Sequence, residues 1–180
     1  RILILIFATI AFFACKKKES EEDPSNSSNN SYTVNYKDQN LQGIIGGIAW
    51  EYLTGETHVS YFDENEYWVN IVDSIGNDTC NLPFSKRSKI LFIHQEDTLN
   101  PEMKIGKYDL SFEWDENAVN RTITLVYYDE ENTPQNMIAT EGQYELLSVD
   151  TINNFVSGRI DAFFDNSNFV NGNFTIKYCR

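Results

Sequence analysis

The sequence predicts an all-β domain, and three observations support this fold class. Apolar and polar residues alternate with a period of two over much of the chain from Leu41 onward, as expected for strands with one face on a core and the other in water. No long apolar stripe with the 3.6-residue period of a helix competes with this pattern. Clusters of Gly, Asn, Asp and Pro separate the alternating segments, which is typical of turns between short strands.

Three segments show the alternation most clearly: residues 108–115, 122–127 and 174–178. The first places four large apolar side chains on one face and four polar ones on the other. Further strands are expected at residues 44–53, 58–62, 66–72, 89–94, 143–149 and 155–164. Residues 165–168, Asp-Asn-Ser-Asn, form the expected hairpin loop between the last two strands.

About nine short strands of this kind fold either as two packed sheets or as a closed barrel. We favour an antiparallel β-sandwich over residues 41–180. The alternative is a lipocalin-like β-barrel, whose family motif places a Gly and a Trp two residues apart on the first strand. Here Gly47 and Trp50 are three residues apart, so the Trp would face the opposite side.

Composition and charge narrow the possible partners. The 180 residues are 41% hydrophobic and 14% aromatic, which is enough for one well-packed domain. The formal net charge is −13. Because nucleic acids and anionic lipid surfaces are bound through clustered Lys and Arg, this balance argues against both, and no nucleic-acid partner is expected.

The first 14 residues read as a secretion signal. Apart from Thr9, residues 2–14 are apolar, with Arg1 before them and Cys15 after them. The run is shorter than the roughly 20 apolar residues that cross a bilayer, and fits the apolar region of a signal peptide.

Residues 12–15, Phe-Phe-Ala-Cys, resemble the lipobox of bacterial lipoproteins, although that motif commonly has Leu and a small residue where both Phe residues stand. The resemblance implies removal of residues 1–14, lipidation of Cys15 and a partner membrane reached through the N-terminal lipid. Residues 15–40, rich in charge, Ser and Asn, are then expected to be a flexible tether. Their charged block resembles export tags of surface lipoproteins, so we expect an outer-membrane location facing the periplasm or the cell surface.

Two cysteines remain, Cys80 and Cys179. An exported chain permits a disulfide between them. Two separate buried thiols are the alternative.

Three blocks carry a resemblance to a known family: residues 46–50, residues 105–110, and residues 156–160 followed by 171–174. Together they resemble a family of bacterial (Bacteroidota-type) envelope lipoproteins with a C-terminal β-domain of unknown function. The resemblance covers residues 41–180 and implies an envelope location. It implies no activity and transfers no functional residue.

No catalytic motif stands out in the sequence. His58 and His94 are the only histidines and lack partners at metal-ligand spacing, so we expect no metal site and no cofactor, and we place both on strand surfaces. Acidic groups at residues 63–66, 115–117 and 129–132 could serve a glycan hydrolase or a calcium site. Carboxylates in loops usually stabilise turns, so we expect a protein that is not an enzyme.

Three tripeptides, each Asp followed by Ser or Thr and an aliphatic residue, resemble acceptors for O-glycosylation in some Gram-negative bacteria. They would place glycans on Ser74, Thr98 and Thr151. Asp before Ser or Thr also simply ends strands well.

The function expected from the sequence is that of a binding or structural module at the cell envelope, with a glycan or an envelope protein as partner. Exposed aromatic rings suit glycans, and Trp50, Trp68 and Tyr128 are the candidates, although packing in the core is the alternative for each. The other functions considered are a lipocalin-like carrier of an apolar ligand, which needs an interior cavity, and the glycan hydrolase.

Overall fold

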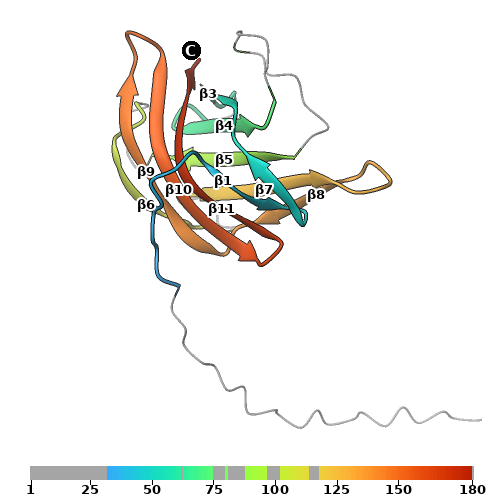
Figure 1. Ribbon diagram of the computed structural model, residues 1–180. Coiled ribbons are helices and arrows are strands. Elements are labelled where there is room, and N and C mark those ends of the chain that lie inside the picture. Colours follow the sequence, from blue (N-terminus) through green and yellow to red (C-terminus); the bar gives the residue numbers. More distant parts are fainter. Residues whose placement is uncertain are drawn as a thin grey trace, which may run out of the picture. The chain divides into compact units, whose positions relative to one another are not determined.

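The computed structural model describes residues 32–61, 63–74, 80, 88–96, 102–113 and 118–179. Residues 32–180 form one compact unit, shown in Figure 1. Cys15 and Thr98 lie outside the described residues. Within those ranges, no helix is long and apolar enough to cross a membrane.

The prediction of an all-β fold is confirmed. The strands are β1 (Gln42–Ile45), β2 (Ile48–Glu51), β3 (Thr54–Val59), β4 (Glu66–Val72), β5 (Lys89–Gln95), β6 (Gly106–Asp109), β7 (Arg121–Tyr128), β8 (Pro134–Ile138), β9 (Glu141–Asp150), β10 (Phe155–Asp165) and β11 (Asn168–Tyr178). They form one sheet in the order β6-β9-β10-β11-β3-β4-β5-β7-β8, and the β1–β2 hairpin is attached to β11. All pairs are antiparallel except β11 with β3.

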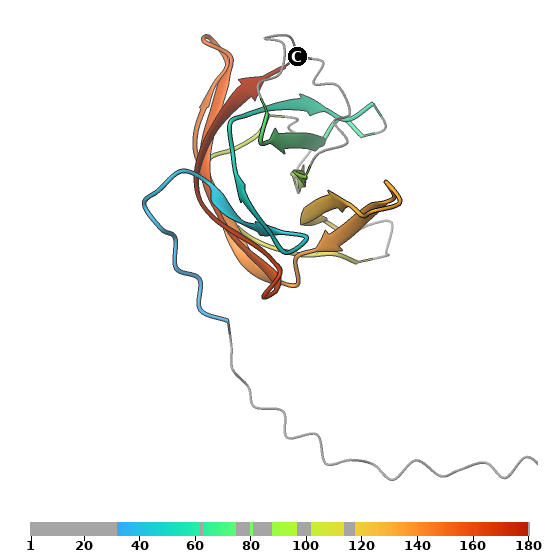
Figure 2. The same ribbon diagram turned by 45° about the vertical axis from the view of Figure 1, so that its right-hand side comes forward.

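The single sheet curls into a half-barrel, which Figure 2 shows with its open side to the right. It therefore lies closer to the barrel alternative than to a sandwich of two separate sheets. The curl brings distant strands together where β8 passes into β9: the N–H of Ala139 donates to Ile123 of β7, and the N–H of Thr140 donates to Phe163 of β10. A bulge between β9 and β10 adds local twist.

The concave face holds the core. Alternate residues of β4, β5, β7, β9, β10 and β11 point inward, and their side chains are buried almost completely; examples are Ile71, Phe92, Leu125, Leu146 and Ile160. The β1–β2 hairpin turns at Gly46 and Gly47, which have positive φ angles of 61° and 75°. A Cβ at Gly46 would lie 2.5 Å from the ring of Tyr127, so the hairpin packs against β7 at a position that only glycine permits.

The compact unit begins at Tyr32, before the boundary expected at residue 41. Residues 32–40, here called the strap, lie on the convex side of β10 and β11, where Figure 2 shows them in blue. Backbone contacts hold the end of the strap. The N–H of Asn173 donates to the carbonyl of Gln39, and Asn40 forms an isolated β-bridge with Asn173. A largely polar segment can be ordered in this way because its polar groups find partners on the sheet.

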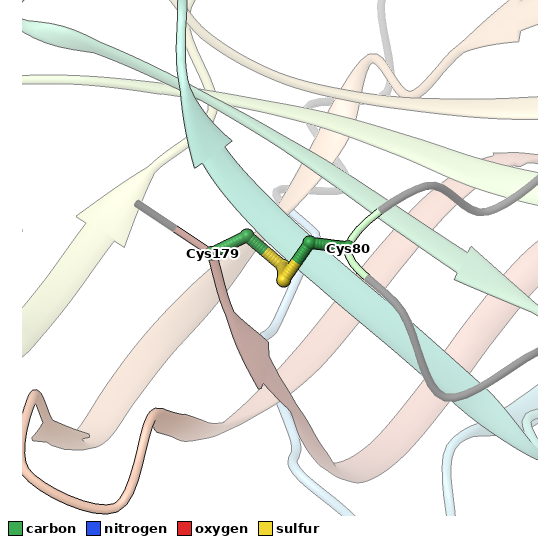
Figure 3. Close-up of a disulfide and its surroundings, with 2 residues drawn as sticks. All are labelled: Cys80 and Cys179. Carbon is green, nitrogen blue, oxygen red and sulfur yellow. A yellow bond between two sulfur atoms is a disulfide. The ribbon is translucent and has the colours of Figure 1, made fainter.

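A disulfide joins Cys80 to Cys179, with a Cα–Cα distance of 5.6 Å (Figure 3). The alternative of two separate thiols therefore does not apply. Cys179 follows β11, and its N–H donates to the carbonyl of Thr57 in β3. The bond thus attaches the segment after β4 to the end of the chain, where β11 runs parallel to β3.

Candidate ligand-binding site

A groove lies between the strap and the convex face of β10 and β11. Two cross-strand pairs form its floor, Asp161 with Asn171 and Phe163 with Phe169. The intervening pair of Ala162 with Val170 faces the core, because side chains on a strand alternate between its two faces. The groove has a volume of about 220 Å³. We call it the strap groove.

The polar half of the strap groove is well hydrogen bonded. The hydroxyl of Tyr32 donates to Oδ1 of Asp161 at 2.6 Å, and the N–H of Asn35 donates to Oδ2 at 2.7 Å. Asn171 accepts from the N–H of Lys37 at 2.8 Å and donates to the carbonyl of Asn35 at 3.0 Å. Asp161 is 4% exposed, so these contacts replace the water that its carboxylate would otherwise bind.

The other half of the groove is aromatic. The rings of Tyr32 and Phe163 are stacked, with centroids 5.9 Å apart and an angle of 26° between the planes. Phe169 lies beside Phe163 on the neighbouring strand, and all three rings are only half-buried. Burial, followed by the hydrogen bond to Asp161, raises the pKa of Tyr32, so its hydroxyl keeps the proton that it donates.

The strap also contacts the sheet nearer to β9, through charged and aromatic side chains. Nε of Arg159 donates to Oε2 of Glu145 at 2.6 Å, and its guanidinium lies 4.3 Å from the ring centroid of Tyr36. The Tyr36 hydroxyl donates to Gln143 at 3.0 Å. This cation–π contact and the hydrogen bonds fix the strap, so one wall of the groove is preformed.

A second polar cluster lies inside the half-barrel. It consists of His94, Glu96 and Tyr144, here called the inner cluster. Nε2 of His94 lies 2.9 Å from Oε1 of Glu96, and Nδ1 lies 2.7 Å from the hydroxyl of Tyr144. A carboxylate only accepts, so the Nε2 proton points to Glu96 and Nδ1 accepts from Tyr144. Glu96 also accepts from the N–H of Lys104 at 2.8 Å.

The geometry of the inner cluster resembles a relay, but its burial excludes contact with a substrate in this conformation. His94 and Tyr144 are both 0% exposed and Glu96 is 5% exposed. Aromatic rings cover the cluster: Tyr108 stacks on Tyr144 at 5.2 Å, and Phe92 packs edge-on against it at 4.2 Å. Burial lowers the pKa of His94 and raises the pKa of Tyr144, so both are neutral and serve the packing of the interior.

The structure corrects one placement made from the sequence and decides between two alternatives at another. His94, expected on a strand surface, is in the core, whereas His58 is half-buried. Trp50 is also in the core at 4% exposed, and its Nε1 donates to the carbonyl of Ser88 at 3.1 Å, so its ring offers no face to a ligand. Trp68 is 41% exposed on the convex side of β4 and hydrogen bonds to Glu66.

The other sequence-predicted residues are not brought together into one site. Tyr128 is half-buried at the end of β7. Ser74 is half-buried after β4, and Thr151 is exposed in the turn between β9 and β10. These positions lie apart from the strap groove, whose lining includes none of them.

The loop carboxylates mainly stabilise turns. Asp129 accepts from the N–H groups of Glu131 and Thr133, and the latter hydrogen bond is the main reason that its pKa is lowered. Asp63 caps a similar turn by accepting from the N–H of Asn65. Among the described residues, no group of three or more His, Cys, Asp or Glu side chains could hold a metal ion.

The strap groove is not predicted from the sequence, because the composition of residues 15–40 as a whole is typical of a tether. A signal was present: Tyr32, Val34 and Tyr36 alternate with polar residues, and in the structure these three are half-buried while the residues between them are exposed. This is the pattern of a strand with one face covered. It does not reveal that the covering face lies on β10 and β11, more than 120 residues away.

Comparisons of the chain with protein-family models, with curated proteins and with solved structures found no match.

Proposed function

We propose that this protein is a cell-envelope lipoprotein whose β-domain is a binding module, held at the outer membrane by a lipid on Cys15. The observation that carries the binding role is a preformed groove on the convex face of the half-barrel, whereas the inward-facing side chains of the described strands are almost completely buried. The disulfide between Cys80 and Cys179 supports export, because such bonds persist mainly in oxidising compartments. It does so independently of the lipobox resemblance.

The filled interior disfavours the carrier alternative. A cavity large enough for an apolar ligand would leave its lining accessible to water. The inward-facing side chains of the described strands are instead almost completely buried, including Tyr67, Ile90, Ile123 and Val170 at 0% exposed. No opening toward a central ligand is visible among these residues.

The turn carboxylates Asp129 and Asp150 also disfavour the hydrolase alternative. A glycosidase needs two carboxyl groups facing each other, one with a raised pKa. Asp129 and Asp150 instead have lowered pKa values, chiefly because backbone N–H groups of their own turns donate to them. Each of these two carboxylates stabilises its own turn.

The lipoprotein assignment is tested by replacing Cys15 with Ser in the native host. We expect the wild-type chain to sediment with membranes and to partition into detergent, and the Cys15→Ser chain to keep its signal and lose the added lipid mass. Cys80→Ser is the matched control, because it removes a cysteine and leaves the lipobox intact. Identical mass and partitioning of wild type and Cys15→Ser would refute the anchor.

We also propose O-glycosylation, with Thr151 the best-placed acceptor. It is exposed in a tight turn between two long strands, where a bulky sugar would remain in water. Ser74 is half-buried and Thr98 lies outside the described residues. Intact-mass spectrometry of the natively produced chain should show a glycan mass that Thr151→Val reduces by one unit. A mass accounted for by the polypeptide and lipid alone would reject this proposal.

A further inference from the structure

We propose that the strap groove binds one ring of a neutral saccharide. This inference rests on the proposed function as a binding module and names the ligand class. Phe163, Phe169, Asp161 and Asn171 on the sheet and Tyr32 on the strap line this groove.

The two halves of the groove match the two kinds of surface on a sugar. A pyranose ring has apolar C–H faces and a rim of hydroxyl groups. The rings of Tyr32, Phe163 and Phe169 provide apolar surface that is already half exposed. Asp161 and Asn171 lie two residues further along the same strands and on the same face, but they are only 4% and 8% exposed beneath the strap. The exposed strap residues Thr33, Asn35 and Lys37, which also line the groove, would therefore provide the polar groups for the hydroxyl rim of a ring packed on the aromatic side chains.

Asp161 and Asn171 hold the strap over the sheet. The oxygens of Asp161 accept hydrogen bonds from the Tyr32 hydroxyl and from the N–H of Asn35, and Oδ1 of Asn171 accepts from the N–H of Lys37. These bonds immobilise the strap residues that line the groove, so a ligand would meet a preorganised site.

Charge and size indicate a neutral saccharide ring. The lining contains one carboxylate, Asp161, and one ammonium, Lys37, so the groove is close to neutral while the whole chain carries a net charge of −13. Acidic sugars would be repelled by that field. The volume of about 220 Å³ is below the roughly 300 to 1,000 Å³ of sites for drug-sized ligands, so one ring fits and the rest of a glycan would extend into solvent.

The proposal is tested with the purified full chain, in a detergent without a sugar headgroup. Saturation-transfer NMR with a panel of methyl glycosides comes first, followed by titration of the best ligand. We expect saturation transfer to the ring C–H protons of at least one neutral glycoside and a dissociation constant on the order of 1 mM for one ring. The uronic-acid counterpart should bind more weakly.

Three variants locate the binding. Phe163→Ala should weaken binding about tenfold, because it removes the central ring of the aromatic half. Asn171→Ala should weaken binding by a similar factor, and a thermal melt of this variant reports whether the fold survives. Phe155→Ala is the matched control, since Phe155 is a half-exposed Phe on the same face of β10, paired with Lys177 far from the groove. It should bind as wild type does.

The outcomes separate this inference from the proposed function. Absence of saturation transfer from every neutral glycoside, or binding that Phe155→Ala weakens and Phe163→Ala does not, would overturn the saccharide site. Selective binding of acidic sugars, or of peptides in place of sugars, would also overturn it. A chain that sediments with membranes but binds no sugar would leave the lipoprotein assignment standing.

Discussion

The inner cluster and the strap groove are both built from polar side chains that satisfy one another, yet they differ in exposure. In the inner cluster, His94 joins Glu96 to Tyr144, and aromatic rings cover the set. In the strap groove, Asp161 and Asn171 hold a crossing segment, and half-exposed rings lie beside them. This difference in exposure shows that a connected polar network does not by itself indicate a functional site. An adjoining surface that a ligand can reach is also required.

The same contrast separates the two described tryptophans. Trp50 satisfies its N–H inside the protein and belongs to the core, whereas Trp68 keeps two fifths of its surface exposed on the convex side. The concave face thus provides the stability of the half-barrel, and the convex face provides the surface available for recognition. Four predictions test this division.

The largest expected effect follows from His94→Ala. The substitution leaves the hydroxyl of Tyr144 and the carboxyl of Glu96 buried with one partner fewer each, so we expect a loss of about 5 kcal/mol in the free energy of unfolding. Urea unfolding followed by tryptophan fluorescence measures it. His58→Ala is the control and should cost less than about 1 kcal/mol, because His58 is half-buried. Similar losses in both variants would contradict the interior role of His94.

The second prediction compares the tryptophans. Trp50→Ala should cost about 4 kcal/mol, because it empties a core position and leaves the carbonyl of Ser88 without its donor. Trp68→Ala should cost about 1 kcal/mol, because much of the ring is already in water. Thermal unfolding of both variants by circular dichroism checks the difference. Equal unfolding midpoints would show that the two rings contribute equally to stability, which would contradict the assignment of stability to the concave face.

How far the sequence predicts this fold can be judged from particular elements. Period-two alternation locates β4, β7 and the three long strands β9 to β11, because those strands bury one face, whereas β5 is located by a continuous apolar run. It does not reveal that residues 44–53 are a hairpin, since the glycines at 46 and 47 interrupt an otherwise apolar run and turn the chain through positive φ angles. The sequence does not predict β8, because its first residue, Pro134, is typical of a turn. Pro is nevertheless tolerated at the first residue of a strand.

The inner cluster was within reach of the sequence, and the strap groove was not. His94 shares its parity with Ile90 and Phe92, which are buried on the concave face, so strand alternation alone would have placed it in the core. The groove depends on which strand the strap crosses and on which cross-strand pairs lie beneath it. Those are long-range choices of register that local patterns do not encode.

The third prediction concerns pH and isolates the inner cluster. Burial lowers the pKa of His94 below its ordinary value of 6.5, so below that pH the unfolded chain binds a proton that the folded chain resists. The contribution of His94 is therefore complete above about pH 6.5 and is lost as the pH falls, by at most about 1.4 kcal/mol per pH unit.

The measurement is the free energy of unfolding from pH 7.5 to pH 5, compared with the His94→Gln variant. This variant should lack the part of the slope that His94 causes, whereas His58→Gln should keep it. A wild-type slope that His94→Gln leaves unchanged would show that the imidazole does not titrate as its burial requires.

The smallest expected effect concerns the strap. Tyr32→Phe removes the hydroxyl that donates to Asp161 and keeps the ring stacked on Phe163, so the free energy of unfolding should fall by only about 1 to 1.5 kcal/mol. The loss should be local, because the strap lies on the convex surface and its removal opens no cavity in the core. Hydrogen exchange should therefore accelerate at the amides of Asn35 and Lys37, which donate to Asp161 and Asn171. Exchange at Phe92, inside the half-barrel, should stay slow, and faster exchange there would mean that the two faces are energetically coupled.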